Sequence, residues 1–171
     1  MKGPRPLSSW PRQFLGRVIC ICLLLVTILC SCNPARAEDY TKRDLQGSDF
    51  SHQDLTNSAF LKANLRNSDL SHVNARGVDL FGANLINANL QEADLTAATL
   101  DMANLQHADL RGAVLEDSLM WLTKVEGAQI EGADFTNALL RKDTLSTLCE
   151  SATGTNPITG RETRDSLNCP G

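Results

Sequence analysis

The chain has 171 residues, with sixteen basic and twenty acidic side chains and a formal charge of −4 at neutral pH. That length fits one domain. The acidic balance argues against a nucleic-acid partner, because binding to phosphates needs clustered lysine and arginine.

Residues 1–37 are expected to form a secretory signal peptide. A basic start precedes an apolar run of twelve residues, 18–29, and the sequence Ala35-Arg36-Ala37 offers cleavage after Ala37. The run is short for a membrane span, which needs about twenty residues. The alternative is lipidation at Cys32, in a sequence similar to a bacterial lipobox. Membrane contact is expected only through the leader or such a lipid.

Cleavage after Ala37 would leave eleven basic and twenty acidic residues, a charge of −9. It would also leave two of the six cysteines, Cys149 and Cys169. An even pair in an exported protein predicts a disulfide, and two free thiols are the alternative.

A five-residue period runs through the sequence from Tyr40 to Leu145. An apolar residue stands at every fifth position, and only Ala75 among these centres is small. Two residues before the centre the chain prefers alanine, and one residue before it prefers aspartate or asparagine. A period of five matches neither a helix nor a strand, so it indicates a superhelical repeat.

The units Ala83-Asn-Leu-Ile-Asn87 and Ala108-Asp-Leu-Arg-Gly112 resemble the pentapeptide-repeat family. The resemblance implies an all-β fold, a right-handed quadrilateral β-helix with one repeat per side and about twenty residues per coil. It implies that the centres and the small residues point inward. We expect this β-helix over residues 38–147.

After the repeats, residues 148–171 are expected to form a short helical cap stapled by the disulfide. A helix is predicted over 144–151, and Thr159 with Glu162 forms a capping-box pattern that predicts a second helix over about 160–167. The export signal, the acidic start and the sequences Asn156-Pro157 and Asn168-Cys-Pro170 resemble the thylakoid-lumen branch of the family. The single leader favours a cyanobacterial origin, and the periplasm is the alternative compartment.

No enzyme, cofactor or nucleic-acid function is expected. The chain after residue 37 lacks the common nucleophile, phosphate-loop and zinc motifs, and its aspartates lack the glycine-rich calcium-binding nonapeptide. A weak candidate for a metal site or proton sensor is the column His52, His72 and Glu92, because residues twenty apart stack in successive coils.

The expected interaction face for a protein partner lies on the side with centres Phe60, Leu80, Leu100 and Met120. Its outward positions are apolar, which usually marks a docking surface, although a terminal segment could cover it instead. The residues of this predicted face are Leu61, Phe81, Met102, Leu119, Trp121, Leu122 and Leu139.

These features favour an exported, non-enzymatic scaffold or interaction protein, most simply in the thylakoid lumen. One alternative is a DNA mimic that binds topoisomerase, which suits the acidic charge and conflicts with export. The other is a lumenal protein that responds to thiol redox state through Cys149 and Cys169.

Overall fold

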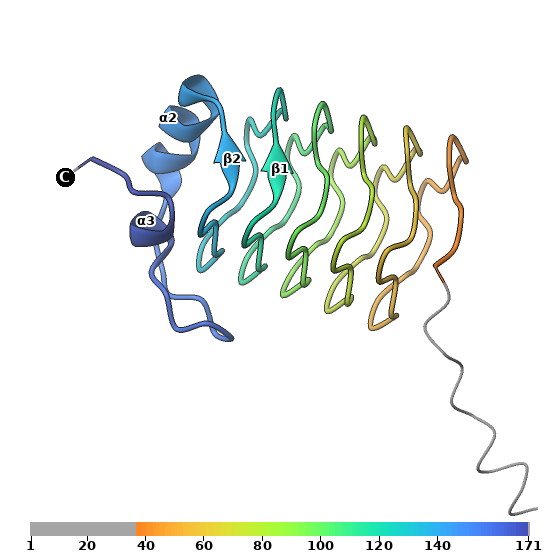
Figure 1. Ribbon diagram of the computed structural model, residues 1–171, viewed down its shortest axis with the longest axis horizontal. Coiled ribbons are helices and arrows are strands. Elements are labelled where there is room, and N and C mark those ends of the chain that lie inside the picture. The colour runs from red at the N-terminus through yellow and green to blue at the C-terminus, as the bar shows by residue number, and fades with distance from the viewer. Residues whose placement is uncertain (1–36, 171) are drawn as a thin grey trace, which may run out of the picture. The chain divides into compact units, whose positions relative to one another are not determined.

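Residues 37–170 are described by the computed structural model, and all of the expected leader before Ala37, including its apolar run and Cys32, lies outside them. Parallel bridges join residues twenty apart, from Asp39 with Ala59 to Val114 with Asp134. Strands β1 (Leu119–Met120) and β2 (Leu139–Leu140) pair in the same parallel register. The coil of four five-residue sides is therefore confirmed, and Figure 1 shows the coils stacked in a row.

Backbone hydrogen bonds join each coil to the next. The N–H of Leu90 donates to the carbonyl of Asp109 at 2.7 Å, and the N–H of Asp109 donates back to Ala88 at 2.9 Å. The second residue after each centre turns the corner in a left-handed conformation, as at Asn87 with φ of 57°. This turn lets a short side end every five residues, and it accounts for the many asparagines and glycines at that position.

The interior is filled by the centres and by the small residues two positions before them. Leu90 and Ala93 are fully buried. The small centre Ala75 lies between the buried Val73 and Val78, which stand where most repeats carry alanine or serine. We infer that these valines fill the volume that a larger centre would occupy, since protein interiors are close-packed.

Aromatic rings fill the N-terminal end of the interior. Tyr40 stacks on Phe60 with ring centroids 4.5 Å apart, and Phe50 meets Phe60 edge to face at 5.6 Å. Phe50 and Phe60 are buried, whereas Tyr40 is partly exposed at the first coil. The larger rings thus close an end where no described coil precedes them.

Two helices follow the coils and lie over their C-terminal end (Figure 1). Helix α2 spans Lys142–Ser151, so the coils end at Arg141, six residues before the predicted boundary, and Leu145 belongs to α2. Helix α3 spans only Thr163–Ser166. No helix among residues 37–170 is long and apolar enough to cross a membrane.

The predicted capping box of the second helix is wrong. Glu162 is the N-cap of α3, and no side-chain hydrogen bond caps that helix. Thr159 instead belongs to a turn that begins at Asn156, because its N–H donates to the Asn156 side chain at 2.9 Å. That turn starts a non-helical segment, which explains why α3 begins later than expected.

Candidate docking site

An apolar patch lies on the side whose centres are Phe60, Leu80, Leu100 and Met120. Trp121 is 57% exposed and Leu139 is 60% exposed. No segment among residues 37–170 folds back over them, so the alternative of a covering segment is not met within the described chain. We define the apolar patch as Met102, Leu119, Trp121, Leu122 and Leu139.

The predicted face is less continuous than expected. Asp101 occupies the same column as Phe81 and Trp121, and its carboxylate accepts a hydrogen bond from the backbone N–H of Trp121 at 2.6 Å. On the other side of this interruption, Leu61 and Phe81 are only half-exposed. The exposed apolar surface is thus concentrated in the C-terminal coils, and the two N-terminal members of the predicted face contribute less to it.

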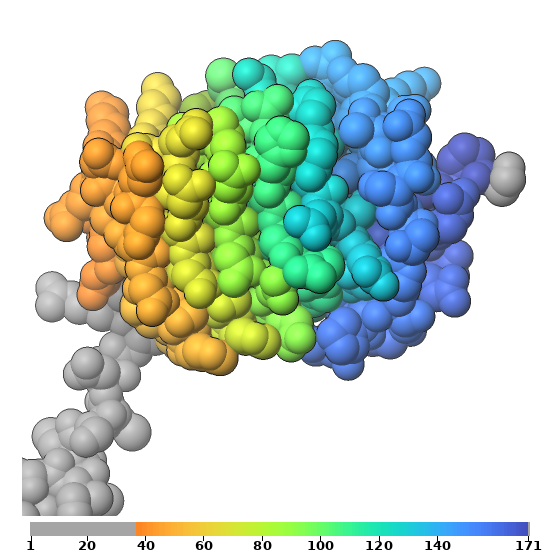
Figure 2. Space-filling view, turned by 180° about the vertical axis from the view of Figure 1, so that it is seen from behind, coloured from red at the N-terminus to blue at the C-terminus, as the bar shows by residue number. Residues whose placement is uncertain are grey.

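A shallow groove borders the patch where the coils meet α2. Trp121, Leu140, Arg141, Lys142 and Asp143 line it, with a volume of about 540 Å³. The Arg141 guanidinium lies 5.9 Å from the centre of the Trp121 ring and 3.1 Å from the Asp143 carboxylate. The groove therefore offers an aromatic surface and a cation to a partner. In Figure 2, side chains of successive coils lie as adjacent bands, seen from behind the view of Figure 1.

The histidine column stacks as the register predicts. The rings of His52 and His72 are 4.8 Å apart and nearly parallel, and Nδ1 of His72 lies 3.4 Å from a Glu92 carboxylate oxygen. Within residues 37–170, however, no group of three or more histidine, cysteine, aspartate or glutamate side chains is placed to hold a metal ion. The column is a surface stack, and the structure gives the metal hypothesis no site.

Aspartate and asparagine before the centres have a local structural role. Oδ1 of Asp69 accepts the N–H of Ser71 at 2.9 Å, and Oδ1 of Asp79 accepts the N–H of Phe81 at the same distance. Such a side chain satisfies a backbone donor at the corner that the coil ladder does not reach. The same contact occurs on all four sides, which explains the preference without calcium.

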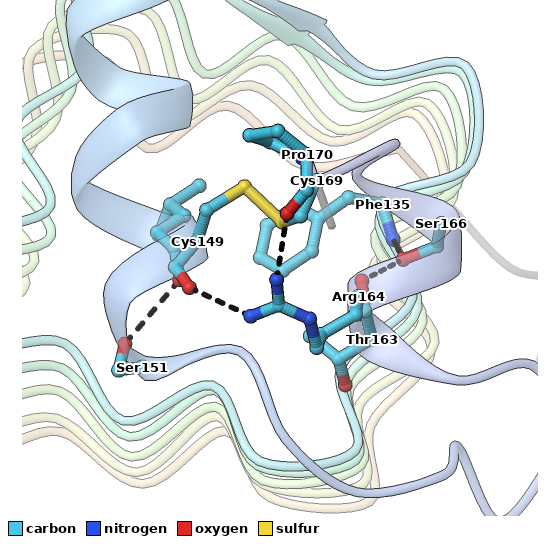
Figure 3. The surroundings of a disulfide bond; sticks show 9 residues. Phe135, Cys149, Ser151, Thr163, Arg164, Ser166, Cys169 and Pro170 are labelled. Carbon is cyan, nitrogen blue, oxygen red and sulfur yellow. Dashed lines mark hydrogen bonds between the residues drawn. A yellow bond between two sulfur atoms is a disulfide. The ribbon is translucent and has the colours of Figure 1, made fainter.

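The disulfide between Cys149 and Cys169 forms, with Cα atoms 5.7 Å apart. Figure 3 shows the Arg164 guanidinium beside the disulfide. It donates hydrogen bonds to the carbonyl of Cys149 at 3.2 Å and to the carbonyl of Pro170 at 3.0 Å. The Ser166 hydroxyl accepts the N–H of Phe135 at 3.0 Å. The disulfide thus joins α2 to the C-terminal tail, and α3 binds the last coil directly.

Asn156 anchors the segment between the two helices, and the sequence did not reveal this role. Its side chain is buried, and Nδ2 donates to the carbonyls of Gly112, Ala113 and Gly132 at 2.9–3.2 Å. A Cβ at Gly132 would lie 3.0 Å from the Thr155 carbonyl oxygen, and Gly132 also has a φ of 70°. The column of His52, His72 and Glu92 continues with Gly112 and Gly132. This change to glycine was the signal in the sequence, because it marks the place where another stretch of backbone comes close.

Asp134 and Arg161 form a second contact between the cap and the coils. Arg161 lies 3.1 Å from the Asp134 carboxylate and 3.3 Å from that of Glu116. Burial alone would raise the pKa of Asp134, but hydrogen bonds from Thr136 and the nearby Arg161 charge hold that pKa below its usual range. The buried carboxylate is therefore ionised and paired at neutral pH.

Comparison with known proteins agrees with this fold. The family described as pentapeptide repeats matches residues 44–80 and 79–117, in eight copies. A crystal structure of a pentapeptide repeat protein from the Arabidopsis thaliana thylakoid lumen is 39% identical, with a TM-score of 0.76, over 77% of this chain and 92% of that one. The chain belongs to the pentapeptide-repeat family. Its four-sided coils agree with the right-handed quadrilateral β-helix of that family.

Two curated relatives of this pentapeptide-repeat protein are from the same plant. Thylakoid lumenal protein TL20.3, chloroplastic, is 56% identical over 43 residues, or 25% of this chain and 15% of the relative. Thylakoid lumenal 15 kDa protein 1, chloroplastic, is 49% identical over 47 residues, or 28% of this chain and 21% of the relative. These matches span less than a quarter of either relative.

A cyanobacterial structure is also similar. HetL from Nostoc sp. strain PCC 7120, described as involved in the regulation of heterocyst differentiation, is 31% identical with a TM-score of 0.53. The alignment covers 56% of this pentapeptide-repeat protein and 46% of HetL. The similarity is thus to part of HetL, and the lumenal structure matches over more of both chains.

Proposed function

We propose that this pentapeptide-repeat protein is an exported, non-enzymatic scaffold of the thylakoid lumen that docks a protein partner on its apolar patch. The observation that carries the proposal is the exposure of Trp121, Leu122 and Leu139 together on one side of the rod. The lumenal location is supported by the two curated relatives, by the lumenal crystal structure and by the expected leader.

The composition of the patch supports protein binding. Tryptophan, methionine and leucine give a large apolar area, and tryptophan and arginine are among the residue types enriched at positions that dominate binding energy. Arg141 lies over the Trp121 ring, which stays 57% exposed. Outward positions on the other sides are mostly polar, so the patch is the apolar surface best suited to a partner.

The test is affinity capture from solubilised thylakoid membranes and lumen with the processed chain as bait. The double variant Trp121→Ser with Leu139→Ser should lose the captured partner, because each change removes an exposed apolar side chain without touching the interior. Ile158→Ser is the matched control, since Ile158 is 63% exposed but lies on the C-terminal segment. Capture that survives the double variant would exclude the patch as the docking site.

A second candidate function is a response to thiol redox state, favoured by the position of the disulfide in the cap. Cys149 and Cys169 are only partly buried, so a thiol enzyme could reach them. Reduction would free the C-terminal tail from α2. Measuring the reduction potential tests this function, because a value below about −300 mV would mark a structural bond that the compartment does not reduce.

A further inference from the structure

One column on the apolar side of the rod carries a negative charge, an aromatic ring and a positive charge in that order. Asp101, Trp121 and Arg141 stand at the same position of three successive coils. Successive coils lie about 4.8 Å apart, so the two charges are at nearly equal distances on either side of Trp121. Reversing the direction of this column therefore exchanges its charges and leaves the ring in place.

Both ends of this column keep charge that a second molecule can meet. Asp101 is partly exposed and has no cation within 4.0 Å among residues 37–170. At the other end, Arg141 pairs with Asp143 at 3.1 Å, and the exposed Lys142 beside it has no acidic partner within 4.0 Å in the same part of the chain. The column is thus negative at Asp101 and net positive beyond Trp121.

We propose, on the basis of the docking function above, that the partner on the apolar patch is a second copy of this chain. The two rods lie antiparallel, with a twofold axis at the level of Trp121. The two Trp121 rings then meet, Leu119 and Leu122 meet their equivalents, and Asp101 of each copy faces Arg141 of the other. A parallel arrangement would oppose each charge to its own kind, which destabilises an interface.

The groove beside α2 fits the same arrangement. It lies on the C-terminal side of Trp121, where the coils meet α2, and has a volume of about 540 Å³. Phe81 is half-exposed in the same column, two coils on the N-terminal side of Trp121. Because antiparallel packing exchanges these two directions, Phe81 of each copy comes opposite the groove of the other. An aromatic ring that enters a groove is a typical anchor of a protein interface.

The size of the contact predicts a weak dimer. Each side of the rod is roughly 16 Å wide, and the coils from Phe81 to Arg141 extend over roughly 15–20 Å. Their product is a projected area of roughly 300 Å², well below the about 800 Å² that each partner of a stable complex buries. We therefore expect a reversible dimer with a dissociation constant above roughly 1 μM.

The test is sedimentation velocity of the processed chain from about 5 μM to about 500 μM, where a transient dimer should form as the concentration rises. Asp101→Arg alone and Arg141→Asp alone should each weaken dimerisation by roughly tenfold or more, because each opposes like charges at both ends of the column. An equimolar mixture of the two variants should dimerise again, since every changed charge then faces its opposite on the other variant.

Recovery in the mixture identifies a contact between copies, because damage within one copy is not cured by the other. Asp49→Arg is the matched control, since it reverses a charge on the opposite side of the rod and also loses a hydrogen bond from a backbone N–H, that of Ser51. This control should dimerise as wild type does. Trp121→Ser with Leu139→Ser should stay monomeric.

Several results would overturn the second copy as the partner. They are a wild-type chain that stays monomeric at every concentration, single charge variants or a patch variant that dimerise as wild type does, loss of the dimer in Asp49→Arg, and a mixture that stays monomeric. Each of these contradicts the antiparallel register or the use of the patch.

Affinity capture separates this outcome from failure of the docking function. A tagged bait should retain the untagged chain, and Trp121→Ser with Leu139→Ser in the bait should lose it. If a monomeric chain instead retains a different protein through the patch, the docking function stands and the second copy is excluded. Capture and sedimentation that both ignore the patch variant would overturn the two together.

Discussion

Asn156 is expected to decide whether the C-terminal segment stays bound to the coils. Its Nδ2 bonds reach across 24 to 44 residues of sequence, and its Oδ1 accepts the N–H groups of Ile158 and Thr159, both at 2.9 Å. One side chain thus joins two coils and shapes the turn that follows. Asn156→Ala removes all of these bonds and opens a small space beneath the segment.

The size of the effect follows from the groups left without partners. The carbonyl of Ala113 keeps a hydrogen bond from the Asp134 N–H at 2.9 Å, whereas the carbonyls of Gly112 and Gly132 receive only the Asn156 donors among the described residues. An unsatisfied buried group costs about 1–3 kcal/mol, so the two carbonyls that Asn156→Ala leaves unpaired should lower the free energy of unfolding by about 2–6 kcal/mol. For a domain of this size, that corresponds to a melting temperature roughly 10 °C lower.

Thermal unfolding followed by circular dichroism measures this effect. Asn156→Asp is the sharper variant, because a carboxylate cannot donate to the three carbonyls and its charge faces their oxygens. It should destabilise the protein at least as much as Asn156→Ala at neutral pH, and recover part of the loss in acid, where the carboxyl is protonated. Glu150→Ala, at an exposed position on α2, is the control. A melting temperature unchanged by either Asn156 variant would refute the anchoring role.

Two further predictions concern the cap. Changing Cys149 and Cys169 to serine should lower the free energy of unfolding by about 3 kcal/mol, as expected for a loop of about twenty residues, and a reducing agent should bring wild type to the same value in urea titrations. Insensitivity of wild type to reduction would contradict this. The lowered pKa of Asp134 contributes stability above its unfolded pKa of about 3.9 that is lost as pH falls through the lower folded value. The stability lost in Asp134→Asn should therefore be largest at neutral pH and shrink below about pH 4, and a constant difference in urea unfolding across this range would exclude the Arg161 pairing as its cause.

The coil and its interior could be predicted because every repeat forms the same contacts with its neighbours. Leu90 and Ala93 are buried for the reason that applies to each equivalent position, so a period visible in the sequence carries the structure. The column of His52 and His72 followed from the same register. The predicted disulfide required only that the last two cysteines lie in an oxidising compartment.

The candidate site was predicted less completely, because exposure depends on more than register. The period placed Phe81 and Trp121 in one column, but it gave no weight to Asp101 between them. It also continued the repeats to Leu145, although α2 begins at Lys142. A single five-residue unit, such as the one centred on Leu145, has an apolar spacing that fits either a helix or a coil. Contacts with the rest of the chain decide which of the two forms.

The sequence alone determined that this chain forms stacked coils of twenty residues, since the interior repeats locally and each coil needs only its neighbours. The tertiary structure decided where the coils stop and how the end is closed. Asn156 binds carbonyl groups and Arg161 binds carboxylates that are distant in the sequence. The chain has many groups of both kinds, so the sequence does not show which of them are bound. Such contacts have no period, and only the folded arrangement brings their members together.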